Sequence, residues 1–408
     1  MGFAIPAGCL ALLARLSANG YPAHLVGGCV RDLCRGVEPH DYDLTTSATP
    51  DEMKRVFAGF RVIETGIAHG TLTVLSDGAA YEVTTYRVDG AYTDGRHPDA
   101  VSFTSSLEED LARRDFTVNA MAYSPESGLV DPFGGQADLS ARLIRAVGDP
   151  DRRFSEDSLR ILRALRFSST LGFEIEERTA DAVFRLSPTV RRVSPERIRE
   201  ELFKLLSGAS SGAVLIRYRD ALLSALPALT PIGEAWEDPA RAAARLPSDP
   251  ALALAALSRP LGYGAVDSLF RSLKTDNKSR LRASRAVEAY AAGLPDGPAS
   301  AGLFLVDYGR ETALDALSLA EACGDPAAQK ARNALESHAA FGAPTTLADL
   351  AVGGDDLAAL GIPPGPERGK LLSALLRLAA TGEVANDREA LLARAGAIKD
   401  GKNVKPPS

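Results

Sequence analysis

The chain has 408 residues, so it is too long for one compact core and is expected to form two to four domains. The hydrophobic content of 45% and the charged content of 24% are ordinary for a soluble globular protein, and the net charge of −7 means that a nucleic-acid partner must meet a local basic surface. The four cysteines show no paired spacing, and the sequence has no signal-peptide pattern. No apolar run approaches the roughly 18 residues of a membrane helix. We therefore expect a cytoplasmic protein that does not enter a membrane.

The N-terminal part of the chain mixes helical and strand patterns. In chain order we expect a helix over 4–18 with Leu10, Leu13 and Leu16 on one side, a strand over Ala23–Val26, a helix over 30–34, a helix from Thr49, and strands over 71–75 and 81–86. These elements predict a small mixed sheet with helices packed against it.

Two alternate aspartates, Asp41 and Asp43, follow a glycine turn. If they lie on a strand, side-chain alternation places both carboxylates on the same face. Two neighbouring carboxylates stay ionised at little cost only with a cation between them, and hard oxygen ligands suit Mg²⁺. Upstream, Gly28 lets backbone N–H groups approach an anion, and Arg31 can fork onto a phosphate. An isolated D-x-D is often a solvated turn, but G-G-x-x-R-D followed closely by D-x-D indicates nucleotidyl transfer.

A third carboxylate is commonly part of a two-metal phosphoryl-transfer site. Glu82 is our candidate because it faces the same way as Thr84 and Tyr86 on the expected strand, although a lone strand glutamate is often just exposed. Asp115 is the alternative. Just before it, Arg114 can bind triphosphate oxygens, or it can belong to a surface charge cluster at the start of the helix that we expect next.

Four charged residues recur at three-residue intervals after residue 155: Asp157, Arg160, Arg163 and Arg166. On a single helix such residues are neighbours, so Asp157 and Arg160 can simply form an intrahelical ion pair. Alternatively, the aspartate accepts from the exocyclic amine of cytosine or adenine while the arginine donates to the ring acceptor beside it. That arrangement would select C and A and reject G and U without a template strand.

Helical patterns continue to the end of the chain. Ser194 and Pro195 mark a clear helix start, and prolines and glycines then divide an alanine- and leucine-rich region into short helices. The five histidines form neither a His-Asp pair nor an H-x-x-x-H pattern, which excludes a zinc or HD-type hydrolase site.

Six segments together resemble the class II tRNA nucleotidyltransferase and bacterial poly(A) polymerase family. They are LVGGCVRD (25–32), DYDL (41–44), RRDFTVNAMAY (113–123), LVDPFGG (129–135), EDSLRILRALRF (156–167) and SPERIREEL (194–202). The resemblance implies an α+β head with a polymerase-beta-like sheet over 1–150. An all-α neck (151–215), body (216–345) and tail (346–408), the last with a basic end at Lys402 and Lys405, would follow.

The resemblance also implies roles for individual residues. Asp41 and Asp43 would hold the metal ions, Gly28, Arg31 and Arg114 the triphosphate, Asp157 and Arg160 the incoming base, and Arg163 and Arg166 the nucleotide and its site. Enzymes of this family rebuild the CCA end of tRNA from CTP and ATP with Mg²⁺, and the helical half would grip the acceptor arm and T-arm. The residues of those tRNA contacts and the oligomeric state stay open.

Members of the family differ in what they add. Poly(A) polymerases carry a basic G-R-R-F-like signature, from which residues 66–71 depart. The loop over 87–98, with Asp94 and Arg96, looks intact, which favours addition of the terminal A, although an enzyme adding only that A would look the same. A catalytically silent RNA-binding protein is the alternative from another class, and the intact Asp41 and Asp43 argue against it.

Overall fold

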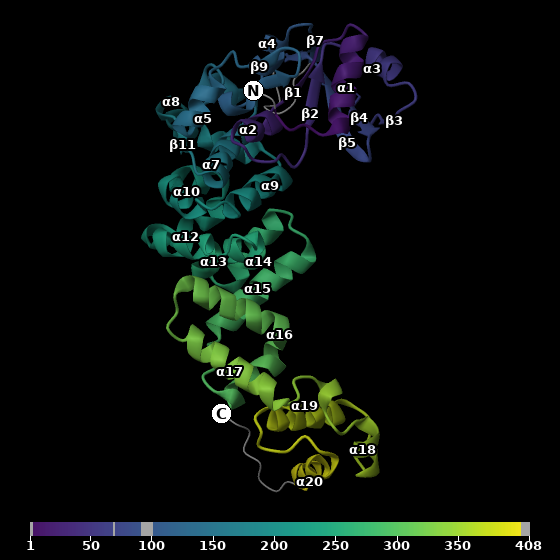
Figure 1. Cartoon of the computed structure of the whole chain (residues 1–408). Helices are drawn as coiled ribbons and strands as arrows, with labels where there is room; N and C mark the ends of the chain where they lie inside the picture. Colours follow the sequence, from purple (N-terminus) through teal and green to yellow (C-terminus); the bar gives the residue numbers. More distant parts are fainter. Residues whose placement is uncertain (1–2, 68–69, 91–100, 401–408) are drawn as a thin grey trace. The chain divides into compact units, whose positions relative to one another are not determined.

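The computed structural model describes residues 3–67, 70–90 and 101–400 (Figure 1). The chain divides into two compact units, Met1–Pro227 and Ala228–Ser408. The first contains the mixed sheet and its helices followed by further helices, and the second is built from helices. An α+β head with a helical remainder is therefore confirmed, whereas the finer division into head, neck, body and tail stays a prediction.

A seven-stranded sheet forms the centre of the first unit. Its strands are β1 (Ala23–Val26), β2 (Asp43–Thr46), β3 (Arg61–Ile63), β4 (Thr71–Ser76), β5 (Ala79–Thr85), β8 (Ala122–Ser124) and β9 (Gly128–Val130). Their order is β3-β4-β5-β2-β1-β8-β9, and β2 and β5 run parallel while the other neighbours are antiparallel. The predicted strands are confirmed. Asp77 and Gly78, both with positive φ, form the two-residue turn that joins β4 to β5.

Helices α1 (Ala7–Ala18) and α3 (Pro50–Val56) bury their apolar faces with the sheet in one hydrophobic cluster. The helix start at Thr49 is confirmed by a capping box with Glu52. For α1 the expected apolar face is partly wrong, because Leu10 is 37% exposed and Leu12 is buried instead.

Helix α2 (Gly28–Cys34) begins at the glycine turn, two residues before its predicted start. The expected helix after Arg114 is wrong: the chain makes only the short 3-10 turn η2 (Thr117–Asn119) and then enters β8. Pairing of β8 with β1 and β9 satisfies the backbone there, so the sheet overrides a local helical pattern.

Several smaller elements complete the head. They are β6 (Arg87–Asp89), β7 (Val101–Phe103), α4 (Leu107–Ala112), α5 (Gly135–Ala141) and β10 (Leu143–Ile144), which pairs with β11 (Glu174–Ile175). Strands β6 and β7 pair with each other, and the loop that we expect over 87–98 begins within β6 and ends before β7. Asp94 and Arg96 themselves lie outside the described residues, as do residues 68–69 of the segment that departs from the poly(A) polymerase signature.

Apart from the two-residue strand β11, the rest of the first unit is helical as predicted. It comprises α6 (Pro150–Glu156), α7 (Leu159–Leu171), α8 (Glu177–Leu186), η3 (Ser187–Arg192), α9 (Pro195–Leu206), α10 (Ser211–Arg217) and α11 (Arg219–Ala225). Pro195 occupies the first turn of α9, which confirms the predicted helix start.

The second unit consists of packed helices. They are α12 (Glu237–Ala244), α13 (Pro250–Ser258), α14 (Tyr263–Ser272), α15 (Asn277–Ala291), α16 (Pro298–Cys323), α17 (Ala328–Phe341), α18 (Gly354–Ala359), α19 (Pro366–Ala380) and α20 (Arg388–Lys399). Gly309, with φ +76°, kinks the long helix α16. Lys402 and Lys405 of the expected basic end lie outside the described residues.

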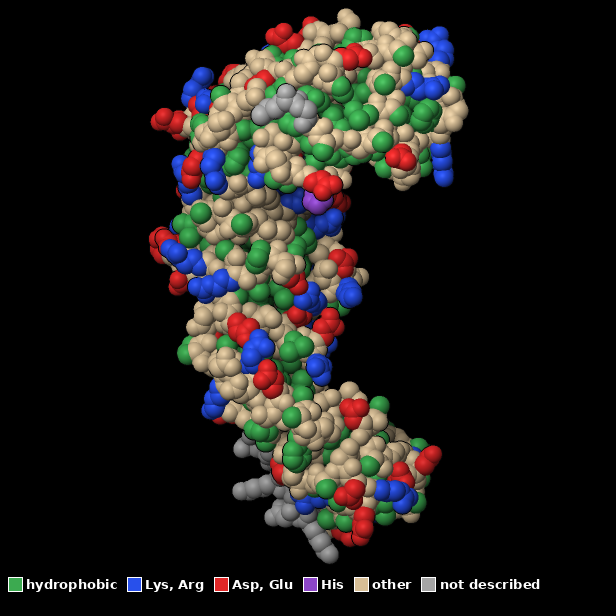
Figure 2. Space-filling view, viewed as in Figure 1, with side chains coloured by type: hydrophobic (Ala, Val, Ile, Leu, Met, Phe, Trp, Pro, Cys, Tyr) green, Lys and Arg blue, Asp and Glu red, His purple; other side chains and the backbone are tan. Residues whose placement is uncertain are grey.

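The described part of the chain contains no helix with the length and apolarity needed to cross a membrane. On the face shown in Figure 2, Lys and Arg side chains are interspersed with Asp and Glu side chains.

Candidate active site

An acidic cluster lies at the start of β2. Asp43 is the first residue of this strand and is paired in parallel register with Glu82 of β5. Asp41 precedes the strand and is exposed, so the strand alternation that we invoked for the two aspartates does not apply to it. Burial, followed by repulsion from Asp41 and Glu82, raises the pKa of Asp43 to about 6, while Arg114 opposes the shift. Asp41, Asp43 and Glu82 therefore interact electrostatically, although they do not lie on one face of a single strand.

This donor set fits a hard divalent cation. Desolvation and mutual repulsion make the ionised form of Asp43 costly, and a cation among the oxygens would relieve both effects. Among the described residues, no group of three or more His, Cys, Asp or Glu side chains is already gathered as a metal site. The fit therefore rests on the chemistry of the oxygen donors, and their role as ligands stays a prediction.

Glu82 and Asp115, the two candidates for a third carboxylate, have different surroundings. Glu82 is exposed beside Asp43, and it shares its strand face with Thr84. The prediction that Tyr86 shares that face is wrong, since Tyr86 follows the strand and its buried hydroxyl bonds His24 Nδ1 at 2.8 Å.

Asp115 is buried and its carboxylate is occupied. Oδ1 accepts from the backbone N–H of Phe116 at 2.8 Å and from Asn119 Nδ2 at 3.1 Å, and Oδ2 accepts from Arg163 Nε at 2.7 Å. Although burial alone would raise it, pairing with Arg163 and these hydrogen bonds lower the pKa of Asp115 to about 2. Asp115 therefore anchors protein groups, and the surroundings favour Glu82 as the third ligand.

Two arginines lie over the glycine turn. A Cβ on Gly27, whose φ is +81°, would lie 3.0 Å from Arg114 Nη1, and a Cβ on Gly28 would lie 3.6 Å from Arg31 Nη2. The positive φ and the short contact favour glycine at position 27, whereas the contact at Gly28 is an ordinary one, and the predicted approach of backbone N–H groups to an anion stays a prediction. Arg31 forks onto Asp32 at 3.0 and 2.9 Å, and its Nη1 donates to Asn119 Oδ1 at 2.8 Å.

Asp110 of α4 contacts both Arg113 and Arg114. Its buried carboxylate lies 2.8 Å from Arg113 Nη2 and 3.6 Å from Arg114 Nη2, and Oδ2 accepts from Thr45 Oγ1 at 3.2 Å. Burial opposes ionisation, but the two guanidinium groups lower the pKa of Asp110. Arg114 Nε is buried without a hydrogen-bond partner among the described residues, so this guanidinium keeps donor capacity for an anion.

A pocket of about 260 Å³ opens beside these arginines. It is lined by Arg113, Arg114, Asp115, Asp157, Leu159, Arg160, Arg163 and Arg197. Five of these residues are arginines and two are aspartates, so the lining carries an excess of positive charge suited to a phosphate-bearing ligand. The structure thereby brings four predicted nucleotide-binding residues into one place, namely Arg114, Asp157, Arg160 and Arg163.

The prediction that Asp157 begins a continuous helix with the three arginines is wrong. Asp157 lies between α6 and α7 with extended backbone (φ −142°, ψ 105°), and its Oδ1 accepts from the backbone N–H of Leu159 at 3.0 Å. An ion pair between Asp157 and Arg160 is also wrong: Arg160 Nη1 lies 2.8 Å from Glu156 Oε2, and Asp157 Oδ2 lies 2.7 Å from Arg197 Nη2. The Asp157 carboxylate therefore contacts the first turn of α7 through Oδ1 and also lines the pocket.

Arg166 does not line the pocket. Its Nε lies 2.6 Å from Glu201 Oε2, and its guanidinium stacks 3.8 Å from the centre of the Phe167 ring. Arg163 lines the pocket and also contacts the partner of Arg166, since its Nη1 lies 3.7 Å from Glu201 Oε1. Arg166 is therefore placed to support the wall of the site rather than to contact a ligand.

Three residues of the site were missed from the sequence. Asp110 stands three and four residues before Arg113 and Arg114, a helical spacing that could have revealed it. Arg113 itself adjoins the predicted Arg114 and lines the same pocket. Arg197 belongs to one of the recognised motifs, but its partner Asp157 lies 40 positions away, a separation that carries no local signal.

A mixed sheet with clustered carboxylates next to an arginine-lined pocket defines the class of nucleotidyltransferases, and comparisons with known proteins agree. Residues 23–145 match the poly A polymerase head domain, residues 172–230 the "Probable RNA and SrmB-binding site of polymerase A", and residues 247–395 the tRNA nucleotidyltransferase domain 2.

Whole-length relatives give the family. A CCA-adding enzyme of Limosilactobacillus fermentum is 37% identical over 95% of this chain and 96% of its own length, and one of Geobacillus thermodenitrificans is 39% identical over 94% and 95%. The crystal structure of Bacillus stearothermophilus CCA-adding enzyme in complex with CTP is 34% identical, with a TM-score of 0.82 over 97% of this chain and 98% of that one. The chain belongs to the family of CCA-adding tRNA nucleotidyltransferases, enzymes that generally depend on metal ions.

A more distant structure shares the fold. The Thermotoga maritima CCA-adding enzyme complexed with tRNA is 20% identical, with a TM-score of 0.69 over 96% of this chain and 94% of that one.

Proposed function

We propose that this enzyme adds CCA to the 3′ end of tRNA from CTP and ATP, without a nucleic-acid template. The observation that carries the proposal is the pocket in which Asp157 and Arg160 lie among the arginines next to the glycine turn. It combines groups for a triphosphate with a carboxylate and a guanidinium that can read a base edge. Relatives solved with CTP and with tRNA support the same substrates for this chain.

Base selection would use the hydrogen-bonding capacity that the protein leaves open. Oδ1 of Asp157 accepts from Leu159 N and from Arg197 Nη1, whereas Oδ2 accepts only from Arg197 Nη2 and keeps a lone pair that can accept from the exocyclic amine of C or A. The guanidinium of Arg160 has five N–H donors, of which three make hydrogen bonds in the described structure. A base that offers a carbonyl instead of the amine would place oxygen against carboxylate, and this repulsion would disfavour G and U.

The triphosphate would lie against the arginines. Arg114, with Gly28 and Arg31 beside it, is positioned to hold phosphate oxygens, and Asp110 keeps Arg114 oriented. Arg163 and Arg166 would support the nucleotide and the wall of the site through Asp115 and Glu201. These contacts would align the α-phosphorus with the RNA 3′-hydroxyl, so that positioning supplies much of the acceleration.

The reaction is an in-line substitution at the α-phosphorus. The 3′-oxygen forms the new P–O bond, its proton is released, and the bond to pyrophosphate breaks. Asp41 and Asp43 would hold Mg²⁺, with Glu82 as the third carboxylate. When bound, the metal would lower the pKa of the hydroxyl and neutralise the leaving pyrophosphate. The protein itself forms no covalent bond.

The helical part of the chain would grip the acceptor arm and T-arm of tRNA. The match of residues 172–230 to an RNA-binding region and the tRNA complex of a relative support this proposal. A cytoplasmic location is proposed with it, supported by the tRNA substrate and by the free cysteines Cys9, Cys29, Cys34 and Cys323.

The deciding experiment uses tRNA that ends before CCA. The purified protein is incubated with CTP alone, ATP alone or both, in the presence of Mg²⁺, and the products are resolved at single-nucleotide length. We expect two additions with CTP alone and three with both nucleotides. No addition to this tRNA, together with addition of one A to a parallel tRNA that ends in CC, would identify an A-adding enzyme, and a long A tail would identify a poly(A) polymerase. No addition under any condition would identify a silent RNA-binding protein, and each of these three results would contradict the proposal.

A further inference from the structure

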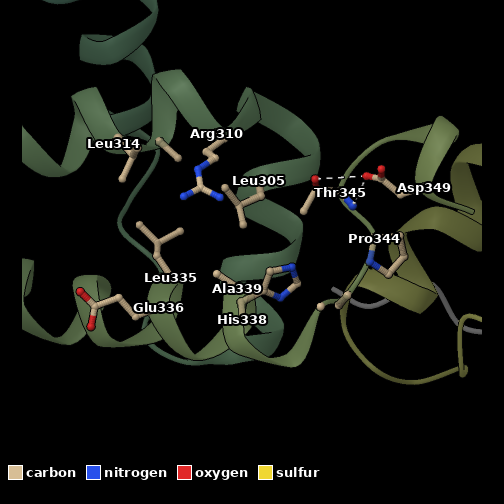
Figure 3. Close-up of a pocket in the computed structure, with 13 residues that line it drawn as sticks. Leu305, Arg310, Leu314, Leu335, Glu336, His338, Ala339, Pro344, Thr345 and Asp349 are labelled. Atoms are coloured by element: carbon tan, nitrogen blue, oxygen red, sulfur yellow. Dashed lines mark hydrogen bonds between the residues drawn. The ribbon is translucent and has the colours of Figure 1, made fainter.

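A second pocket lies within the helical unit, apart from the acidic cluster and the arginine pocket. Its volume is about 390 Å³, and it is formed by the kinked helix α16, by α17 and by the segment that follows α17 (Figure 3). The lining is mainly apolar, with Leu305, Ala313, Leu314, Leu335, Ala339 and Pro344. Pockets of this size and lining are typical of small-molecule sites.

Arg310 supplies a positive charge at this pocket. It is the first residue after the kink at Gly309, it is exposed, and its side chain forms no ion pair or hydrogen bond with the described residues. In Figure 3 its guanidinium extends between Leu305 and Leu335. An exposed arginine beside an apolar cavity is suited to the anionic end of a ligand whose body enters the cavity.

The acids of the lining do not neutralise Arg310. Asp349 Oδ2 accepts from the backbone N–H groups of Thr345 and Thr346 at 3.1 and 2.8 Å, so this carboxylate caps its own turn. Glu336 is exposed, and Figure 3 shows its carboxylate pointing away from Arg310. The positive charge therefore remains available to a bound anion.

His338 supplies a hydrogen-bond acceptor in the wall of the pocket. Its side chain is buried, with 3% of the residue exposed, and it bonds the backbone of Pro298. A proline backbone offers only a carbonyl, so the imidazole donates in that bond. The other nitrogen, Nε2, is buried and has no partner among the described residues. Burial also lowers the pKa of His338, which keeps the ring neutral and leaves Nε2 as a bare acceptor.

We propose that this pocket binds a small aromatic anion that carries one hydrogen-bond donor. The anionic group would meet Arg310, the ring would pack against the leucines, and the donor would meet His338 Nε2. Buried polar atoms are normally paired, so the partnerless Nε2 is what a missing donor would explain. An RNA strand fits less well, since its successive phosphates need several cations and Arg310 is the one Lys or Arg among the residues that line this pocket.

The test uses 8-anilinonaphthalene-1-sulfonate, which combines a sulfonate, aromatic rings and an anilino N–H. The full-length protein is titrated with this probe and its fluorescence is followed. We expect saturable binding to one site. Arg310→Gln should weaken it about tenfold or more, as the loss of a charge-assisted contact does. Arg285→Gln is the matched control, because Arg285 is an exposed arginine on the neighbouring helix α15 and does not line the pocket.

A second variant fills the pocket without changing charge. Ala339 is exposed on α17 and lines the cavity, so Ala339→Phe should abolish probe binding while the melting temperature stays near that of the parent. Competition then separates the sources of the anion: displacement by 5′-AMP points to a phosphate and displacement by 4-hydroxybenzoate to a carboxylate.

Three results would overturn the proposal. The first is probe binding that is unchanged in both variants, and the second is no displacement of the probe by either competitor. The third is a loss of tRNA affinity in Arg310→Gln as large as its loss of probe affinity, measured by tRNA binding to the same variant, which would make the pocket part of an RNA surface. Because binding is read without turnover, none of these results depends on whether the enzyme completes CCA.

Discussion

Arg197 Nη2 lies 2.7 Å from Asp157 Oδ2, although the two residues are 40 positions apart. Asp157 occupies the interruption between α6 and α7, and Arg197 lies in the first turn of α9. The contact brings a guanidinium from a separate helix to the carboxylate that we propose reads the base. We therefore propose a positioning role for Arg197, in which it acts on the base through Asp157.

Replacing Arg197 tests this positioning role. In Arg197→Met we expect discrimination against UTP and GTP to fall by roughly tenfold, since the guanidinium that donates to both oxygens of Asp157 is lost and the carboxylate is freed. The measurement is single-nucleotide incorporation with each of the four nucleotides. Lys204→Met, which removes an exposed charge near the other end of α9, is the control and should keep full discrimination. Equal losses in both variants would indicate a structural effect of α9.

The base-reading residues themselves should affect selection as well as rate. Asp157→Ala removes the acceptor for the exocyclic amine, and Arg160→Ala removes the donor beside it, so both should relax the preference for C and A. Relative kcat/KM values for the four nucleotides provide the measurement. Arg160→Ala should also lower stability, because it breaks the ion pair with Glu156. Unchanged discrimination against UTP and GTP in both variants would refute the reading role.

Substitutions in the acidic cluster should abolish activity without lowering the stability of the fold. Asp41→Ala and Asp43→Asn should each reduce incorporation by on the order of a thousandfold or more, since a metal supplies several kcal/mol of charge stabilisation. With chelator present, Asp43→Asn should melt no lower than the parent, because Asp43 is partly buried and repelled by Asp41 and Glu82. Mg²⁺ with CTP should then raise the melting temperature of the parent but not of the variant. Wild-type incorporation in either variant would show that the metal assignment is wrong.

Replacing Glu82 should change the Mg²⁺ concentration that incorporation requires. In Glu82→Gln we expect a higher Mg²⁺ concentration for half-maximal incorporation, with a normal melting temperature, because the residue is exposed beside Asp43. Glu64→Gln is the matched control, since Glu64 is an exposed glutamate that pairs with Lys54. An identical Mg²⁺ dependence in parent and Glu82→Gln would remove Glu82 from the ligand set.

Asp115 should make the protein sensitive to acid. Its pKa is about 2 in the folded protein against an ordinary value of 3.8, so its stabilisation is complete above pH 3.8 and is lost as the pH falls toward 2. The shift corresponds to about 2 kcal/mol. Asp115→Asn should be less stable than the parent at pH 7, and the gap should narrow below pH 4. Urea unfolding across this range measures both, and a gap independent of pH would contradict the linkage to Arg163.

Local patterns predicted many starts and turns of the fold because they act over a few residues. The glycine turn, the capping box at Thr49, the turn at Asp77 and Gly78 and the start of α9 each depend on the geometry of one turn. Such features follow from residue type alone, so their places along the chain could be read before the fold was known.

By itself, the sequence determined which residue types are available, where most helices and strands begin, and that an acid pair follows a glycine turn. The tertiary structure alone decided which polar and charged side chains from distant parts of the chain meet. Parallel pairing of β2 with β5 places Glu82 beside Asp43. Packing of the helices pairs Asp157 with Arg197 and not with Arg160. Arg31 likewise donates to Asn119, which lies 88 positions away. The reason is that side-chain interactions depend on distance in space, and residues far apart along the chain come close only when the strands and helices carrying them pack together.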